Sequence, residues 1–463
     1  MDSSHPAVAG QPRTEAVNPA HQSVELRNHP AHAGEPAQPA QDLALWEAVF
    51  SRDNLFRALQ RVERNGGAPG VDGMTVAEMR PWLKTNWVAI RKQLDDGTYR
   101  PAPVRRVEIP KPDGGVRELG VPTVLDRLIQ QSIAQALTPI FDPAFSEHSF
   151  GFRPGRNAHQ AVREARGYVA EGNVWVVDVD LDRFFDRVQH DMLMARVARR
   201  VSDKRVLRLI RRYLDAGIMV EGIKQRNTEG TPQGSPLSPL LANIMLDDLD
   251  RELESRGHRF VRYADDLRVY VRTKRAAERT LAGVTGFLER RLRLKVNQAK
   301  SSAKHAAKAV VLGFGFYFSK DGVKIRIDPK ALRRLRRQVY ELTRRNRSIG
   351  MARRIWLLNR FITGWCGYFA IAEMSSILQG IDAWLRRRLR QVQWKEWKRP
   401  RARIRNLRAL GIPRQQAYEW GYTRKGYWRT AGSPILSRAL PNKYWDTQGL
   451  HGFMTVHTRL RNA

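Results

Sequence analysis

The sequence contains one cysteine, Cys366, among 463 residues. A single cysteine cannot form a disulfide within the chain, and it cannot supply the ligands of a cysteine-based zinc module. Small disulfide-stapled folds and zinc ribbons are therefore excluded. Structural disulfides belong to oxidising compartments, so a chain without a cysteine pair suits a reducing one. We expect a cytoplasmic location.

Long apolar runs are also lacking. The longest covers residues 309–318 (AVVLGFGFYF), whereas a membrane-spanning helix needs about 20 apolar residues. This run is the length of a strand. The N-terminus has no apolar segment like the core of a secretory signal. We therefore expect no membrane partner.

Acidic residues are few relative to basic ones. Asp and Glu total 46 and Lys and Arg total 81, so the formal net charge is +35. Such self-repulsion is relieved when a polyanion binds. The chain also has 12 Trp and 12 Tyr, and basic residues interleaved with aromatic rings favour nucleic acid. A basic but merely solvated surface is the alternative, and the concentration of arginine after residue 329 makes it the weaker one.

The pattern along the chain predicts five segments. Residues 1–41 are rich in Ala, Pro, His and Gln and are predicted to be a disordered leader. An N-terminal extension at 42–100 has helical periodicity, interrupted by a glycine-rich turn. Residues 101–320 mix strands with helices, residues 321–430 form a separate helical domain, and residues 431–463 form a tail. The fold class is therefore α+β.

Several elements of the mixed region have clear signals. A Pro-Asp-Gly-Gly turn between two extended runs predicts a hairpin. The predicted strands cover residues 104–109, 116–119, 174–180 and 260–271, the last with a turn at its centre. The predicted helices cover residues 126–141, 191–217 and 236–256.

Two groups of carboxylates lie at the ends of predicted strands. Asp265 and Asp266 are adjacent at a hairpin tip, and alternation places Asp178, Asp180 and Asp182 on one face of an extended segment. An Asp pair in a turn is common by itself. Two separate groups of like charge, however, need a cation. Nucleotide polymerisation uses two divalent ions about 3.5–4 Å apart, held by anionic oxygens. We therefore predict a catalytic metal site among these acids, in which not all three of Asp178, Asp180 and Asp182 need be ligands.

Blocks of residues around these acids follow one another in a familiar order. They lie at residues 65–73, 109–111 with 117, 149–156, 177–186, 231–239, 263–266, 297–301 and 312–314. In this order they resemble the reverse transcriptases encoded by bacterial group II introns, of the class C kind. The resemblance extends over roughly residues 52–450.

The resemblance implies a right-hand polymerase. Its fingers and palm would combine an antiparallel sheet with helices, and an α-helical thumb/maturase domain would follow. Asp180, Asp265 and Asp266 would bind Mg²⁺, for which Mn²⁺ can substitute. The activity would be RNA-directed DNA polymerisation and intron splicing, supporting mobility by target-primed reverse transcription. The partners would be intron RNA as template, a DNA primer or target and dNTPs, with the protein at the nucleoid during mobility.

The resemblance also implies residues that bind the nucleotide. Lys111 and Arg117 correspond to residues that grip the triphosphate, and a point charge with a bidentate fork suits a polyphosphate. Lys300 corresponds to a proton donor to pyrophosphate, or equally to a phosphate contact.

Other residues correspond to the walls of the nucleotide site. Phe185 corresponds to the ring beneath the sugar that excludes a 2′ hydroxyl, while its neighbour Phe184 is expected in the core. Gln233 and Gly234 correspond to the floor under nucleotide and template, where glycine permits close backbone approach.

The C-terminal region resembles the maturase segment of the same family, with residues 360–369 carrying the match. The RNA-binding residues predicted there are Arg333, Arg337, Arg344, Arg387, Trp394 and Lys398. Asp182 and Leu267 depart from the usual residues of the family. A Cys/His-rich nuclease module is not expected, since one cysteine cannot build it.

Two alternatives share this ancestry. One is a non-catalytic RNA-binding splicing factor, but such a protein has no need to retain Asp180, Asp265 and Asp266 together with the nucleotide-binding residues. The other is a domesticated reverse transcriptase that serves defence or repair, which the polymerase motifs do not exclude. The sequence does not indicate an oligomeric state.

Overall fold

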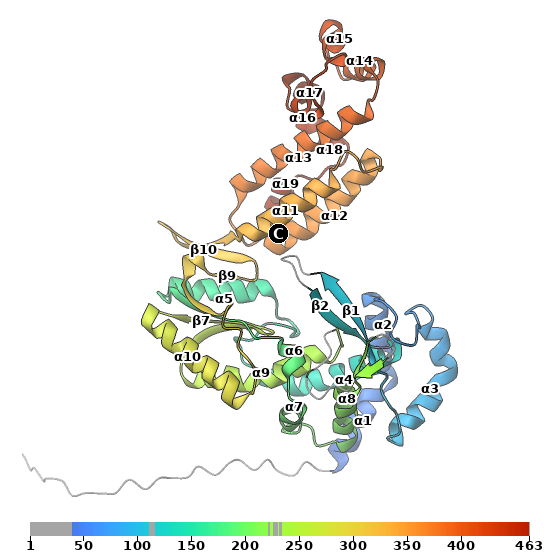
Figure 1. Ribbon diagram of the computed structural model, residues 1–463, viewed down its shortest axis with the longest axis vertical. Coiled ribbons are helices and arrows are strands. Elements are labelled where there is room, and N and C mark those ends of the chain that lie inside the picture. Colours follow the sequence, from blue (N-terminus) through green and yellow to red (C-terminus); the bar gives the residue numbers. More distant parts are fainter. Residues whose placement is uncertain (1–38, 111–115, 221–222, 226–229, 231–233, 463) are drawn as a thin grey trace, which may run out of the picture. The chain divides into compact units, whose positions relative to one another are not determined.

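The computed structural model describes residues 39–110, 116–220, 223–225, 230 and 234–462 (Figure 1). The predicted leader at residues 1–41 lies almost entirely outside the described residues. Within the described part, no helix is both long and apolar enough to span a membrane.

The N-terminal extension consists of three helices, α1 (Pro39–Phe50), α2 (Arg52–Asn65) and α3 (Met79–Asp95). The apolar spacing before residue 65 suggested one helix, but the chain breaks at Ser51. Ser51 has extended backbone, with φ −60° and ψ 148°, and its hydroxyl accepts from the Asn54 amide. An N-cap serine starts a new helix because it satisfies one of the unpaired amides of the first turn.

The fingers are built on a four-stranded sheet in the order β2-β1-β4-β5. Strands β1 (Val104–Pro110) and β2 (Val116–Val121) form the predicted antiparallel hairpin, although its turn lies outside the described residues. The two further strands are β4 (Ile218–Val220) and β5 (Ile223–Gln225). The predicted buried helix is α4 (Val124–Phe141), which packs against α2.

The palm is an antiparallel sheet in the order β6-β7-β3-β8. Its strands are β3 (Trp175–Val179), β6 (Arg259–Tyr263), β7 (Asp266–Val271) and β8 (Ser302–His305). Alternation gives the sheet two apolar faces. Val177 and Val269 pack with α9 (Ser238–Ser255) and α10 (Lys274–Arg291), while Val176 and Tyr270 pack with α5 (Ala158–Ala170) on the opposite face (Figure 1).

The segment predicted as one helix over 191–217 is two helices, because Asp203 caps a second start. The remaining short elements of this region are η1 (Asp142–Ala144), α6 (Phe184–Arg187), α7 (His190–Val197), α8 (Lys204–Asp215) and η2 (Ala306–Lys308).

The longest apolar run forms part of a third sheet. Its strands are β9 (Val310–Val311), β10 (Phe314–Ser319) and β11 (Gly322–Ile327). Leu312 and Gly313 both have positive φ, at 51° and 83°, and so turn the chain between β9 and β10. The run therefore contributes two strands rather than one.

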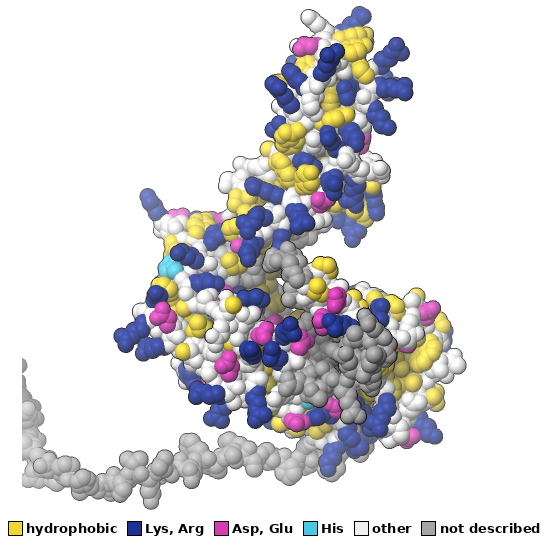
Figure 2. Space-filling model, viewed as in Figure 1, with side chains coloured by type: hydrophobic (Ala, Val, Ile, Leu, Met, Phe, Trp, Pro, Cys, Tyr) yellow, Lys and Arg dark blue, Asp and Glu magenta, His cyan; other side chains and the backbone are white. Residues whose placement is uncertain are grey.

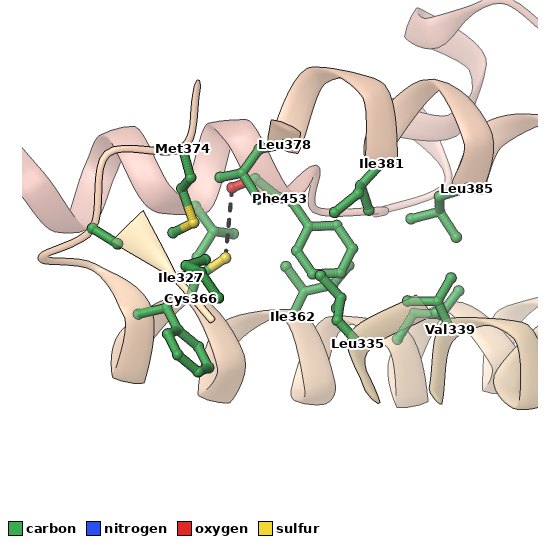
Figure 3. Packing of buried hydrophobic residues seen from close by; sticks show 14 of the residues in the cluster. Ile327, Leu335, Val339, Ile362, Cys366, Met374, Leu378, Ile381, Leu385 and Phe453 are labelled. Carbon is green, nitrogen blue, oxygen red and sulfur yellow. Dashed lines mark hydrogen bonds between the residues drawn. The ribbon is translucent and has the colours of Figure 1, made fainter. Parts of the chain in front are cut away.

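The described chain after residue 328 is helical, whereas the predicted helical domain began at residue 321, where β11 still follows, and the predicted tail at 431–463 also contains helices. Its helices are α11 (Pro329–Leu342), α12 (Met351–Phe369), α13 (Ser375–Glu396), α14 (Pro400–Ala409), α15 (Arg414–Gly421), α16 (Tyr427–Ala431), α17 (Pro434–Ala439), α18 (Asn442–Thr447) and α19 (Phe453–Asn462). Figure 3 shows Leu335 and Ile362 facing Ile381 across their shared core, with Phe453 between them. Cys366 is buried there, and its thiol lies 3.6 Å from the Phe453 carbonyl oxygen.

Candidate active site

The register of the palm sheet brings the predicted acids to one end of two neighbouring strands. Strand β3 pairs with β7 so that Val179 lies opposite Leu267. Continued by one residue, this register places Asp180 beside Asp266, the first residue of β7. Asp265 precedes it in the tight turn between β6 and β7. The two groups are far apart in the sequence, and the antiparallel pairing joins them.

Each of these strand ends also carries a cation. Lys300 Nζ lies 3.6 Å from Asp180 Oδ2. The Arg268 guanidinium contacts the Asp266 carboxylate and lies 3.3 Å from Asp178 Oδ1. Burial raises the pKa of Asp178, while the charge of Arg268 opposes that rise. The negative charge at this end of the sheet is therefore partly neutralised by basic side chains.

The donor chemistry fits a hard divalent cation, because Mg²⁺ prefers carboxylate oxygens. No three Asp, Glu, His or Cys side chains are gathered closely enough to hold a metal in the described part of the chain. Asp180 and Asp266 lie on adjacent strands, but their side chains contact basic groups. A metal ion could bind these two carboxylates only if it replaced the basic side chains that now contact them.

Asp182 is separated from the other acids. Strand β3 ends at Val179, and the Asp182 amide donates to the Lys295 carbonyl over 2.8 Å. Its carboxylate accepts from Arg187 of α6 over 3.0 Å. The extended alternation that suggested a common face for three acids therefore stops short of Asp182.

The block at residues 297–301 holds the backbone of Asp180. The Asn297 amide donates to the Asp180 carbonyl over 2.8 Å, and the Asp180 amide donates to the Ser301 hydroxyl over 3.0 Å. Strand β3 ends at Val179, so these two hydrogen bonds hold the backbone of Asp180 in place of strand pairing.

A buried ion pair holds the turn that carries Asp265. Arg262 of β6 is 1% exposed and bonds both oxygens of Asp250, over 2.7 and 2.5 Å. Its third nitrogen donates to the Ala264 carbonyl and to Asn243 Oδ1, both over 2.9 Å. Sequence reasoning missed this role. The available signal was a charged residue in an otherwise apolar strand, since buried charges are rare unless paired.

The block at residues 149–156 packs against the same turn. An added Cβ on Gly151 would lie 2.2 Å from the Ala264 amide nitrogen, so only glycine fits. The Gly151 carbonyl accepts from Asn243 Nδ2 over 2.9 Å. Asn243 therefore connects this block to Arg262, and the turn is held from two sides.

A cavity of about 790 Å³ lies between the fingers hairpin, α4, α6 and the start of α9. Phe185 and Gly234 both line it. Phe184, by contrast, is 3% exposed in the core and meets the Phe185 ring edge-on at 5.1 Å. Gly234 has φ 110°, and a Cβ there would approach the Gly120 carbonyl oxygen at 3.1 Å. The backbone of the floor thus needs glycine at this position.

The glycine-rich turn at residues 65–70 forms another wall of the cavity. Arg127 of α4 donates to the carbonyls of Gly66 and Ala68, over 3.1 and 2.8 Å. These two hydrogen bonds connect the glycine-rich turn to helix α4.

Three predicted nucleotide-binding groups are not placed. Lys111 and Gln233 lie outside the described residues. The backbone of Arg117 is in β2 opposite Ile109, and its side chain is also outside the description. Their roles remain predictions.

The predicted RNA-binding residues fall into two groups. Arg333, Arg337, Arg344 and Lys398 are exposed, and Figure 2 shows Lys and Arg side chains over the visible face of the C-terminal helices.

The second group, Arg387 and Trp394, makes contacts with other residues of the protein. Arg387 lies 4.1 Å from the Trp428 ring centroid and donates to the Trp428 carbonyl. Trp394 is 1% exposed and lies in the core. Its predicted contact with RNA is therefore wrong, because the aromatic spacing reflected packing between helices.

Comparison with protein families gives two matches. Residues 109–316 match "Reverse transcriptase (RNA-dependent DNA polymerase)" and residues 332–411 match "Group II intron, maturase-specific domain". The first range contains the three acids together with Phe185 and Gly234 of the cavity, and the second contains most of α11 and all of α12, α13 and α14.

Two known relatives each match about half of the chain. The chain is 34% identical over 275 residues to Protein YkfC of Escherichia coli, covering 51% of this chain and 72% of YkfC. It is 35% identical over 208 residues to the group II intron-encoded protein LtrA of Lactococcus lactis subsp. cremoris, covering 45% of this chain but only 34% of LtrA. A chain of the solved "Partial Cas6-RT-Cas1--Cas2 complex" is 27% identical, covers 53% of this chain and 43% of its own length, and has a TM-score of 0.35.

The two family matches, together with the observed sheets and helices, confirm the predicted fold class, a mixed helix-and-sheet polymerase followed by a helical domain. The protein belongs to the reverse transcriptases encoded by group II introns, with a polymerase part followed by a maturase part.

Proposed function

We propose that the protein copies RNA into DNA from a DNA primer, using dNTPs and divalent ions held by Asp180, Asp265 and Asp266. The observation that carries the proposal is the β3–β7 register, which places Asp180 beside Asp266 at the turn that contains Asp265. Bound divalent ions would make the primer hydroxyl nucleophilic and stabilise the leaving pyrophosphate.

The residues of the chain supply position and charge. Arg262 and Gly151 hold the turn of Asp265, while Asn297 and Ser301 hold Asp180. Lys300 lies beside Asp180 and would contact a phosphate if that carboxylate held a metal. Phe185 and Gly234, on the cavity wall, suit the sugar and base of the incoming nucleotide.

We further propose that the C-terminal helices bind intron RNA and assist its splicing. The match at residues 332–411 and the exposed arginines of α11 support this role. The intron itself would then serve as template during mobility.

Primer extension on an RNA template with Mg²⁺ tests the polymerase. Asp265→Asn should lower the rate by at least about a thousandfold, because a lost ligand removes most of the transition-state stabilisation. Asp182→Asn is the matched control and should keep most of the extension rate, since Asp182 pairs with Arg187 and with none of the three proposed metal ligands. Equal extension rates for the two variants would contradict the assignment of Asp265 as a metal ligand.

The splicing role is tested with the same proteins. Asp265→Asn should still bind the intron transcribed from the flanking gene sequence and promote its splicing, because the C-terminal helices are unchanged. If this variant loses both activities although it folds normally, the two functions do not separate as proposed.

A further inference from the structure

The C-terminal helices form an open pocket of about 590 Å³, to which no particular ligand group has been assigned above. Its wall is formed by the end of α11, the middle of α13 and the start of α16. Four arginines line it, Arg344, Arg345, Arg388 and Arg429, and no carboxylate is among its described lining residues. A volume of this size suits a small organic ligand, for which sites are typically about 300–1,000 Å³.

Among the described residues, no carboxylate is hydrogen-bonded to the arginine at the base of the pocket, although the charge of Glu341 acts on it. Arg388 is 8% exposed and donates to the hydroxyl and carbonyl oxygens of Thr343, over 3.0 and 3.1 Å. Neutral oxygens satisfy these donors but leave the positive charge in place. Glu341 pairs with Arg344 at the exposed rim over 3.2 Å. An anion inside the pocket would therefore meet a buried cation whose hydrogen bonds go to neutral oxygens.

Aromatic rings of the pocket lie beside Arg388 and beside Arg387, its neighbour in the sequence. Arg388 is 4.3 Å from the Tyr340 ring centroid and Arg387 is 4.1 Å from that of Trp428. Tyr340 remains 46% exposed and Trp428 39% exposed. A ring supported by a guanidinium can still stack a base on its free area, and such stacking does not depend on base identity.

We propose that this pocket binds one unpaired nucleotide of a single strand, stacking its base on Tyr340 or Trp428 and holding its phosphate with Arg345 and Arg429. A paired base is already stacked and cannot enter. The inference rests on the proposed nucleic-acid-binding function and assigns it a site. An RNA strand and a displaced DNA strand present the same chemistry, so the test uses both.

The full chain is titrated with short single strands that carry 2-aminopurine, as RNA and as DNA, and with their duplexes. The single strands should bind with quenched 2-aminopurine fluorescence, and the duplexes should not quench. The double substitution Tyr340→Leu with Trp428→Leu should abolish quenching and weaken binding at least about tenfold, because it removes both stacking faces. Quenching by RNA alone or DNA alone identifies the strand that the pocket serves.

The matched control is Trp356→Leu. Trp356 is 42% exposed and lies beneath Arg353 and Arg360, at 4.0 and 4.7 Å, away from the pocket. This variant should quench as the unmodified protein does. Ultraviolet crosslinking of a thiouridine-containing strand to the unmodified protein gives a second readout that does not depend on a variant folding, and it should label residues 427–429 or Tyr340.

The proposal would be overturned if quenching persisted in the double variant, or if the crosslinks mapped only to residues outside the pocket. Primer extension by the same preparations separates this result from the proposed polymerase. Primer extension without quenching would contradict only the nucleotide-binding role of the pocket. Quenching without primer extension would support that role and contradict the proposed polymerase activity.

Discussion

Asp180 and Asp266 each contact a basic side chain where the proposed chemistry places a divalent ion. Lys300 and Arg268 neutralise part of the charge that would otherwise repel across the two strands. The two contacts differ in exposure, since the Lys300 side chain is 67% exposed and that of Arg268 is 11% exposed. Lys300 is therefore free to follow a phosphate, while Arg268 stays in the sheet with Asp178.

Phe185 offers a direct test of nucleotide selection. Phe185→Ala should raise incorporation of ribonucleotides relative to deoxyribonucleotides by at least about tenfold, because the removed ring leaves room for a 2′ hydroxyl. Single-nucleotide extension with each substrate measures the ratio of their kcat/KM values. Phe184→Leu is the control, since this buried ring faces the core and its change should lower stability without altering the ratio. An unchanged ratio for Phe185→Ala would contradict its position beside the sugar.

Asp247 on α9 predicts a pH dependence of stability. Burial raises its pKa to about 6, with the charge of Arg251 opposing that rise. The folded state then binds more protons than the unfolded state between the ordinary pKa and pH 6, so stability falls as pH rises through this window. Asp247→Asn should increase the free energy of unfolding by about 1 kcal/mol near pH 8, discounted for partial exposure, and by less near pH 5.

Urea unfolding at both pH values measures this difference. Asp248→Asn provides the control with the opposite sign, because Asp248 pairs with Arg196 and Arg199 over 2.8 and 2.5 Å. That variant should lower stability at both pH values. A stabilisation from Asp247→Asn that is equal at both would show that Asp247 titrates normally.

Among the elements, the β6–β7 turn is held by parts of the chain that come from elsewhere in the sequence. Gly151 meets it from one side, and Arg262, through Asp250 of α9, holds it from the other. Neither contact touches a substrate. Both decide where Asp265 lies.

Gly151→Ala tests this support. The added Cβ must displace the Ala264 backbone, so the extension rate should fall by about tenfold to a hundredfold, since displacements near 1 Å can cost this much. Overpacking should also lower stability by about 1–3 kcal/mol. Gly167→Ala in α5 is the control, because a Cβ there meets nothing within 4 Å. Full activity of Gly151→Ala would mean that the turn does not depend on this contact.

At the scale of the whole molecule, the net charge of +35 makes nucleic-acid binding depend on salt. Binding of a single strand should weaken by at least about a thousandfold between 50 and 200 mM salt, because each neutralised phosphate releases counterions. A double substitution, Arg333→Gln with Arg337→Gln on α11, should make the slope of log affinity against log salt shallower by about 1.4, that is about 0.7 for each lost contact.

The matched control changes the same charge elsewhere. Arg275 and Arg279 are exposed on α10, and replacing both with Gln should leave the slope unchanged if α11 is the binding surface. Equal slopes for the two double variants would assign the effect to net charge alone.

Local patterns in the sequence were sufficient for much of this fold. The fingers hairpin, the buried helix α4 and the helical C-terminal domain all follow from turn residues and apolar periodicity, which act over a few residues. The same local signals missed the breaks at Ser51 and within residues 191–217, where a capping side chain outweighs continuous apolar spacing.

Composition and motif order also identified the family, and motif order gave the prediction that the three acids hold metal. Only the tertiary structure decided what surrounds those acids, because the strand pairing that joins Asp180 to Asp266, the buried Arg262–Asp250 pair and the approach of Gly151 all connect distant segments. It also decided that Trp394 packs in the core while Trp428 stays partly exposed beside a pocket. A sequence reports which residues can carry charge or stack a base, but whether they meet a ligand depends on which of them folding buries.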